Sequence, residues 1–451
     1  MSRYSITLWD SLKYEILTMQ EENLAEEALT ALRAIAVRLS SDSTSATMQT
    51  PIAQYMRPIT KECNEQLHEP QHKQAKPAGK ILSSLAAASA VAFTLVIKAT
   101  VAPLLTLYQD GGSIATQRAL IEVLVQLFDS ALEVFGSWTS YQVSLLIENP
   151  LNPFKDRLFE LFSQALMSIA KEEISFRVAA SRGLLRLAKL RNYLEESEIG
   201  MVVQYYNEIV LTEDGTGRDD LKNEAIQALV DISMSKPKLI MDITFPAFMS
   251  KLPDTDEGGQ NGYIVTLEGL ARLSVEKAIF DTLIRRLLNK LDVVLSSNNS
   301  PKYPRAILSA LLYVFSRRKL DGDPNLRSYY DKIVVGLIRR TVLATTGENL
   351  LTVLNDESVM ETLGCLANLL IRALDEDRRR LVAHQVYTLF TDKHEFAPVP
   401  FRRDANTTQR QTMVLSTYIM AGLQRDVSVR GLILPLPGLI DLSGISTIRR
   451  S

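Results

Sequence analysis

Residues 180–188 read ASRGLLRLA, and this stretch indicates the fold more strongly than any other. Ala180, Gly183, Leu184, Leu187 and Ala188 follow the spacing i, i+3, i+4, i+7, i+8, which places all five on one face of a helix. The same spacing of small and apolar residues returns three times, in AIQALVDIS (225–233), TLEGLARLS (266–274) and ILSALLYVF (307–315).

These stretches begin 45, 41 and 41 residues apart, inside the roughly 40–47-residue period of HEAT-type helical repeats. Gly or Ala at the second position lets a neighbouring helix approach closely. A further copy lies at 28–36, with looser copies at 120–128 and 362–370. The sequence therefore predicts an all-α fold, a HEAT-type α-solenoid of stacked antiparallel helix pairs.

Helices can be assigned along most of the chain, separated by loops rich in Gly, Asp and Pro. We expect them at residues 8–19, 24–39, 52–67, 76–88, 91–108, 114–135, 154–171, 176–190, 199–211, 221–234, 239–252, 263–273, 278–295, 305–315, 329–345, 359–374, 379–390 and 409–423.

The longest apolar run, residues 81–97, has two interpretations. It could cross a membrane, but it is short for that and carries Ser83, Ser84 and Ser89. We expect instead two helices that separate near Ser89, and no direct membrane contact.

No low-complexity linker divides the chain, so residues 1–451 are expected to form a single HEAT-repeat solenoid. Residues 432–445 are apolar but are followed by no partner helix. A solenoid needs polar capping repeats, and an uncovered apolar end tends to associate. We therefore expect a piece of a longer solenoid that self-associates through this uncapped C-terminal end.

Composition narrows the class of protein. Hydrophobic residues make up 46% of the 451, charged residues make up 23%, and the net charge is −2, as in folded soluble proteins. Cys63 and Cys365 form no CxxC motif, which argues for a reducing, intracellular compartment and against both a disulfide framework and a thiolate metal cage.

A zinc site is one interpretation of Cys63, His68 and His72. Pro70 lies between the histidines and interrupts any helix, so they cannot share a helix face. Histidines in a surface turn are the simpler interpretation, and we expect no metal site.

Residues 254–262 resemble other ligand sites only in part. The acidic stretch Asp254–Gly259 begins like a calcium loop, but Val265 stands where the bidentate Glu is required. Its glycines are followed by no Gly-Lys-Ser/Thr. No GxSxG or HExxH motif occurs either. We therefore expect a protein that is not an enzyme, with no catalytic or cofactor-binding residues.

Basic residues gather at 285–286, 317–319, 339–340, 378–380 and 402–403, without interleaved aromatic residues. With the net charge, this argues against direct binding of nucleic acid. Arg182, Arg186 and Lys189 form a stripe opposite the packed face of their helix. Second helices usually line the surface that binds partners in solenoids, so these three are our predicted partner-binding residues; an ordinary solvated helix face is the alternative.

Several stretches, in order along the chain, resemble one family of DNA-repair and transcription proteins, named for methyl-methanesulfonate sensitivity or for methionine requirement in yeasts. They are LWDSLKYEI (8–16), LHEPQHK with KPAGKILSSLAAAS (67–89), TQRALIEVLVQLF (116–128), LNPFKDRLFELFSQAL (151–166) and TQRQTMVLSTYIMAGLQRDV (408–427).

The resemblance implies a non-enzymatic HEAT-repeat adaptor of cytosolic iron–sulfur protein assembly, in cytoplasm and nucleus. Its implied partners are the assembly subunits and iron–sulfur apoproteins, such as an XPD-type helicase. It also implies a middle portion that lacks the family's N-terminal domain and last C-terminal repeats. The two cysteines agree with an escort that does not hold the cluster itself.

Our hypothesis is thus a scaffold that targets iron–sulfur clusters to apoproteins of DNA replication, repair and transcription. The alternative is an unrelated HEAT-repeat interaction scaffold in transport or trafficking. A nucleic-acid-binding repeat is a third class, and it would bind oligonucleotides with a steep dependence on salt.

Overall fold

The computed structural model describes residues 5–18, 22–41, 50–70, 72–138, 148–168, 173–212, 219–254, 262–296, 300–320, 322–336, 353, 356–391 and 406–423. The chain divides into two compact units, Met1–Thr244 and Phe245–Ser451. The expectation of one solenoid over residues 1–451 stays a prediction. Predictions that concern residues 255–261, 339–340, 402–403 and 432–445 lie outside the described residues.

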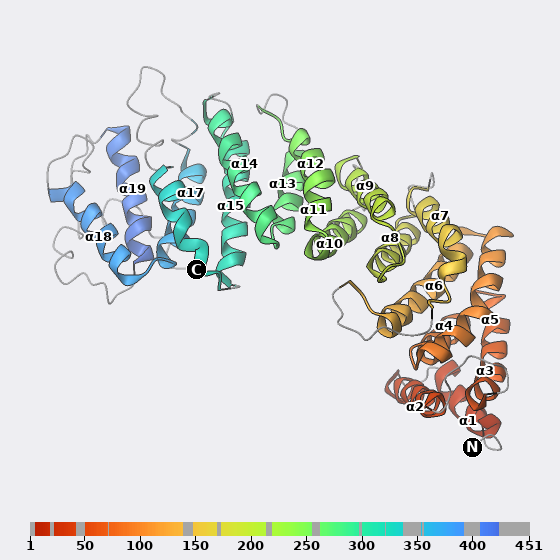
Figure 1. Ribbon diagram of the computed structural model, residues 1–451. Coiled ribbons are helices and arrows are strands. Elements are labelled where there is room, and N and C mark those ends of the chain that lie inside the picture. The colour runs from red at the N-terminus through yellow and green to blue at the C-terminus, as the bar shows by residue number, and fades with distance from the viewer. Residues whose placement is uncertain are drawn as a thin grey trace. The chain divides into compact units, whose positions relative to one another are not determined.

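Unit 1 (Met1–Thr244) consists of alternating first and second helices. Each first helix packs on the second helix that follows it, and the second helices contact one another in chain order, so that they form one layer (Figure 1). The first helices are α1 (Ser5–Thr18), α3 (Pro51–Leu67), α5 (Ala90–Gln109), α7 (Lys155–Leu166) and α9 (Glu196–Thr212); the second helices are α2 (Glu22–Ser40), α4 (Ala75–Ala86), α6 (Ile114–Phe135), α8 (Ile174–Lys189) and α10 (Asp219–Ser235).

Unit 2 (Phe245–Ser451) follows the same plan. Its second helices α13 (Gly262–Leu273), α15 (Lys302–Leu320), α17 (Glu357–Arg372) and α19 (Thr407–Gly422) contact one another in order. The elements that precede them are α12 (Phe245–Lys251), α14 (Lys277–Ser296), the short helical turns η3 (Pro324–Tyr329) and η4 (Asp331–Val335), and α18 (Glu376–Thr391). The predicted all-α solenoid of antiparallel helix pairs is confirmed.

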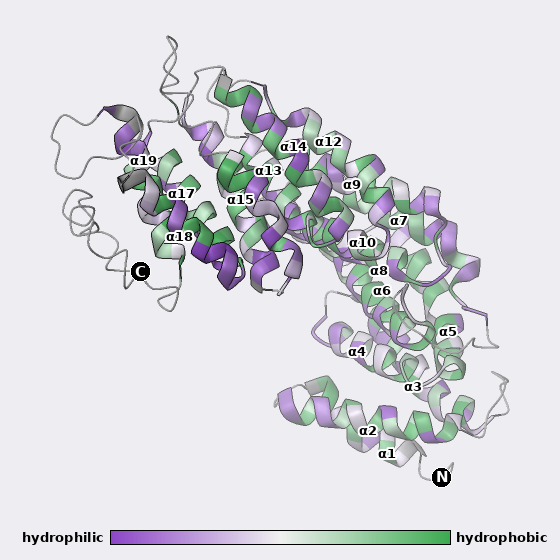
Figure 2. Cartoon of the chain, turned by 60° about the vertical axis from the view of Figure 1, so that its left-hand side comes forward, coloured by the Kyte–Doolittle hydropathy of each residue, from purple (hydrophilic) through white to green (hydrophobic). Residues whose placement is uncertain are grey.

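The predicted register is also confirmed. All five signature positions are buried in each of the four copies, on α8, α10, α13 and α15. The copy at 28–36 is less regular, because Ala31 is exposed although Ala28, Leu32 and Ala36 are buried. Hydrophobic and hydrophilic positions alternate around the helices (Figure 2), as expected when one face of each helix packs and the other faces solvent.

Glycine at the second signature position sits directly on an aromatic ring of the preceding helix. A Cβ atom on Gly183 would overlap the ring of Phe162 in α7, and one on Gly269 would lie 2.7 Å from Cε2 of Phe248 in α12. Phe162 is fully buried, and its ring centroid lies 5.3 Å from that of Phe128 in α6. The ring therefore has little freedom to move aside.

The predicted helix at 239–252 is wrong as a continuous α-helix. The structure has a short helix α11 (Pro237–Leu239), a π-helical turn η2 (Ile240–Thr244) and then α12. Pro246 has no N–H to donate to the carbonyl four residues earlier, so the α-helical ladder cannot run through it. The chain widens to the looser π turn just before that point.

Two other predicted helices differ from the structure in part. The helix predicted at 329–345 begins as the 3-10 turn η3 and the π turn η4, and residues 337–345 lie outside the described part. The helix predicted at 154–171 ends at Leu166 as α7.

The apolar run at 81–97 forms two helices, as predicted. The hydroxyl of Ser89 caps α5 by accepting a hydrogen bond of 3.0 Å from the backbone N–H of Ala92. Within the described residues, α5 is the one helix long and apolar enough to cross a membrane by length and composition, but 56% of its most apolar window is buried inside the protein. It packs against α3, α4 and α6 as a core helix.

The contact between Gly183 and Phe162 makes a stability prediction. Gly183→Ala should lower the free energy of unfolding by about 1–3 kcal/mol, because the added methyl group overpacks a fixed ring. Chemical denaturation followed by circular dichroism measures the change.

Gly200→Ala in α9 is the matched control. A Cβ there would meet Ile243 at an ordinary 3.4 Å, so the gain in helix propensity, up to about 1 kcal/mol, should dominate. If both substitutions stabilised the protein, the close helix approach at Gly183 would be refuted.

Candidate functional site

The predicted partner-binding residues Arg182, Arg186 and Lys189 lie together on α8, away from its packed face. Each of them is paired with an acidic residue of a neighbouring second helix. Arg182 donates from Nε and Nη2 to the two carboxylate oxygens of Glu224 in α10, at 3.1 and 3.3 Å. This hydrogen bond raises the pKa of Arg182 above its already high ordinary value.

The other two residues of the stripe bind acids on either side of α8. Arg186 Nε lies 2.5 Å from Oδ1 of Asp129 in α6, and Lys189 Nζ lies 2.7 Å from Oδ2 of Asp231 in α10. The side chains remain between a quarter and a half exposed. The stripe therefore ties α6, α8 and α10 together along their solvent side.

Similar polar contacts join the earlier second helices of unit 1. Arg33 of α2 forms an ion pair with Glu133 of α6, and the hydroxyls of Ser83 in α4 and Ser130 in α6 lie 2.8 Å apart. We call this set of contacts, together with the three pairs of the α8 stripe, the polar ladder. It gives Arg182, Arg186 and Lys189 a structural role; their role in partner binding stays a prediction.

The basic cluster at 317–319 is partly structural. Arg318 stacks over the ring of Phe280, with Cζ 4.6 Å from the ring centroid, and donates from Nη2 to the carbonyl of Ser274 at 3.2 Å. In the cluster at 378–380, Arg380 forms an ion pair with Glu376 one turn earlier. These contacts use part of the positive charge that the sequence displays.

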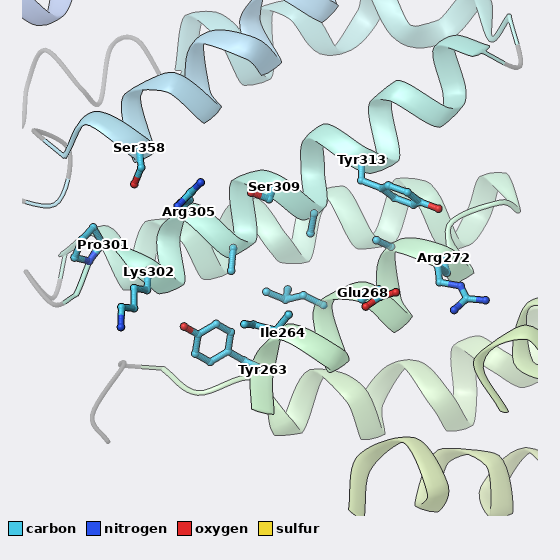
Figure 3. A pocket seen from close by; sticks show the side chains of 14 residues that line it. Tyr263, Ile264, Glu268, Arg272, Pro301, Lys302, Arg305, Ser309, Tyr313 and Ser358 are labelled. Atoms are coloured by element: carbon cyan, nitrogen blue, oxygen red, sulfur yellow. The ribbon is translucent and has the colours of Figure 1, made fainter. Parts of the chain in front are cut away.

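A groove of about 730 Å³ lies between α13 and α15 in unit 2. Ile264 of α13 and Tyr313 of α15 line it although they are 47% and 45% exposed. Its floor consists of small or buried side chains, among them Leu267, Ala271 and Ala310. Ile264 and Glu268 of α13 lie opposite a row formed by Arg305, Ser309 and Tyr313 of α15 (Figure 3).

The groove is charged at the N-terminal end of α15. Lys302 and Arg305 lie there, one turn apart and both exposed. Among the residues that the structure describes, neither cationic group has a hydrogen-bond or ion-pair partner. Asp356 is close enough to feel the charge of Arg305, but its carboxylate caps α17 by accepting from the N–H groups of Ser358 and Val359 at 3.0 and 3.2 Å.

The sequence analysis did not identify this groove. Ile264 and Glu268, and likewise Arg305, Ser309 and Tyr313, repeat at i+4 on helix faces opposite the buried signature. A large apolar residue within such an exposed row is the signal that could have indicated it.

Two of the stretches that carry the family resemblance meet in unit 1. Pro70, His72 and Lys76 from residues 67–89 and Arg118 and Glu122 from residues 116–128 line a hollow of about 410 Å³. Arg118 is held there by Ser175, 2.9 Å from Nη1, and by Glu122, 3.4 Å from Nε. The hollow is therefore closed largely by contacts within the chain.

The residues considered for zinc are placed apart from such a role. Cys63 is buried inside α3, where burial raises the pKa of its thiol. His72 contacts Glu69, with 2.6 Å between Nδ1 and Oε2. In the described part of the chain, no group of three or more His, Cys, Asp and Glu residues is arranged to hold a metal ion.

A double-mutant cycle on Lys189 and Asp231 tests the structural role of the polar ladder. Lys189→Ala and Asp231→Ala should each destabilise unit 1, and the cycle should give a coupling of about 0.5–1 kcal/mol, because the half-exposed pair is partly screened by water. The coupling should fall in high salt. Zero coupling would mean that the pair contributes nothing to the fold and leaves Lys189 available for a partner.

Comparison with known proteins places the chain near one group of relatives. A sequence profile described as "RNAPII transcription regulator C-terminal" matches residues 266–444. The DNA repair/transcription protein mms19 of Schizosaccharomyces pombe is 25% identical over 331 residues, which cover 72% of this chain and 32% of that protein. The human MMS19 nucleotide excision repair protein homolog is 24% identical over 459 residues, covering 97% and 43%.

A further relative is the MMS19 DNA repair/transcription protein of Saccharomyces cerevisiae, 24% identical over 186 residues, which cover 41% of this chain and 17% of that protein. The chain spans less than half the length of each of these relatives. Among solved structures, a crystal structure of importin beta resembles 92% of the chain and 49% of its own length at 14% identity, with a TM-score of 0.41. An engineered protein resembles the same share of the chain at 15% identity, with a TM-score of 0.34.

Proposed function

Because the chain belongs to the MMS19 family of DNA repair and transcription proteins, we propose that it is an adaptor in the maturation of iron–sulfur proteins. In this role it brings the cytosolic assembly subunits to apoproteins of DNA replication, repair and transcription, such as an XPD-type helicase. The cluster is the cargo of the machinery, and the chain is the surface on which machinery and client meet.

The observation that supports this role best is the surface of the second helices. In unit 2 it offers an open groove with exposed Ile264 and Tyr313 beside cations that have no partner among the described residues. A surface of this kind, with apolar side chains rimmed by charge, is suited to binding segments of other proteins.

The state of the two thiols supports a non-enzymatic adaptor. Cys63 and Cys365 lie in different units, and burial raises the pKa of both. A protonated thiol is a poor nucleophile and a poor ligand, because the thiolate is the reactive form. These residues are therefore unsuited both to catalysis and to holding a cluster, which needs several thiolates together.

Location follows from the proposed partners. Proteins of DNA repair and transcription act in the nucleus, while assembly of the clusters takes place in the cytosol. We therefore propose that the chain occurs in both compartments. Membership of this family also leaves the alternative of an unrelated transport or trafficking scaffold without an observation in its favour.

Affinity purification from the native cell tests the adaptor role. The tagged chain should enrich iron–sulfur apoproteins and assembly subunits over an unrelated helical-repeat protein of similar length, and its depletion should lower the iron content of an XPD-type helicase. Mass spectrometry and elemental analysis provide the two measurements. A partner set without iron–sulfur proteins, with unchanged helicase iron, would rule the proposal out.

The metal content of the chain itself is a separate prediction. Protein purified without oxygen should contain substoichiometric iron, because its two thiols are protonated and lie in different units. Cys365→Ser should then support client maturation as well as the unmodified chain does. One equivalent of bound cluster iron that disappears in Cys365→Ser would show that the chain is a cluster carrier.

A further inference from the structure

We propose, building on the adaptor function above, that the groove between α13 and α15 binds a short segment of a partner protein in which a bulky apolar side chain stands near carboxylates. The groove is defined by Ile264 and Glu268 on one wall and by Lys302, Arg305, Ser309 and Tyr313 on the other.

The apolar part of the groove calls for an apolar side chain. Ile264 and Tyr313 are nearly half exposed at positions where a solvated helix face normally carries polar residues. The floor between them is kept low by Ala271, Ala306 and Ala310, which leaves a depression rather than a filled seam. An aliphatic or aromatic side chain placed there would remove this surface from water.

The charged part of the groove calls for carboxylates. Lys302 and Arg305 lie at the N-terminal end of α15, where the helix dipole adds positive potential. Their cationic groups have no partner among the described residues, and the nearest acid, Asp356, is already used as the N-cap of α17. In the polar ladder of unit 1, by contrast, Arg182 and Lys189 have carboxylates of their own chain.

The spacing of the two parts limits the segment. Arg305 and Tyr313 are two turns apart on α15, or roughly 12 Å at 1.5 Å per residue. An extended peptide spans that distance in about three to four residues. The acidic residues should therefore lie within about four positions of the apolar anchor.

Other occupants fit the groove less well. A nucleic acid would meet only two such cations in the described groove, with the carboxylates of Glu268 and Asp356 close by, whereas backbone binding needs many phosphate contacts. A second copy of the chain would have to present an acidic apolar segment of its own. Both are outcomes that the experiment distinguishes.

The test is selection of a displayed library of random short peptides on the full chain. We expect enriched sequences to combine a bulky apolar residue with Asp or Glu within a few positions. Lys302→Glu with Arg305→Glu should weaken the enriched peptides by roughly tenfold or more, and Ile264→Ser should weaken them by a similar factor. Ser309→Trp, which fills the groove from an exposed position, should abolish binding.

Matched controls separate the groove from general effects. Val293→Ser removes an apolar side chain that is 48% exposed but lies on α14, and Lys277→Glu reverses an exposed charge on the same helix. Neither should change peptide affinity, and circular dichroism should show every variant folded. Raising the salt concentration should weaken binding of the acidic peptides.

Several results would overturn the inference. They are failure to enrich any sequence, enrichment of basic or uncharged sequences, and affinities that the groove variants leave unchanged. So are groove-dependent binding of a single-stranded oligonucleotide, and groove-dependent self-association measured by light scattering. If iron–sulfur apoproteins still co-purify in any of these cases, the adaptor function stands and the groove has another use; if peptides bind as expected but no such apoprotein co-purifies, the reverse holds.

Discussion

The close approach of a glycine to an aromatic ring fixes the spacing between the two helical layers. Gly183 on Phe162 and Gly269 on Phe248 occupy the same place in their repeats, so the same constraint acts in both units. A second helix seated in this way can turn only one face inward. Its opposite face is then always exposed, and this face carries the α8 stripe in unit 1 and the walls of the groove in unit 2.

The two units use that exposed face differently. In unit 1, cations and carboxylates of successive second helices neutralise each other, and the surface is largely satisfied by its own chain. In unit 2, Lys302 and Arg305 lack such partners among the described residues, and apolar side chains stand beside them. The repeat architecture therefore sets where a binding surface can lie, while the residues on each repeat decide whether it is closed or receptive.

Sequence periodicity predicted the helix pairs and the buried register because both depend on contacts within a repeat. It failed at residues 239–252, where Pro246 breaks a helix whose apolar pattern continues. It also could not assign partners to Arg182 and Lys189, since those depend on the next repeat. A signal was nevertheless present: Glu224 and Asp231 each lie 42 residues after their partners, close to the repeat period. The groove depends on how much space neighbouring small side chains leave, which no single helix pattern reports.

The nearest-neighbour stacking of second helices has a consequence for how the chain folds. Helices contact those of their own pair and of the adjacent repeats, so that the contact order is low and structure can form without closing long loops. Ser89 and Ser113 cap α5 and α6 through contacts only three residues long, which favours early helix formation. Repeat proteins of this kind can nucleate at any repeat and spread from it. Unit 1 can therefore be folded on the ribosome while the last helices of unit 2 are still being synthesised.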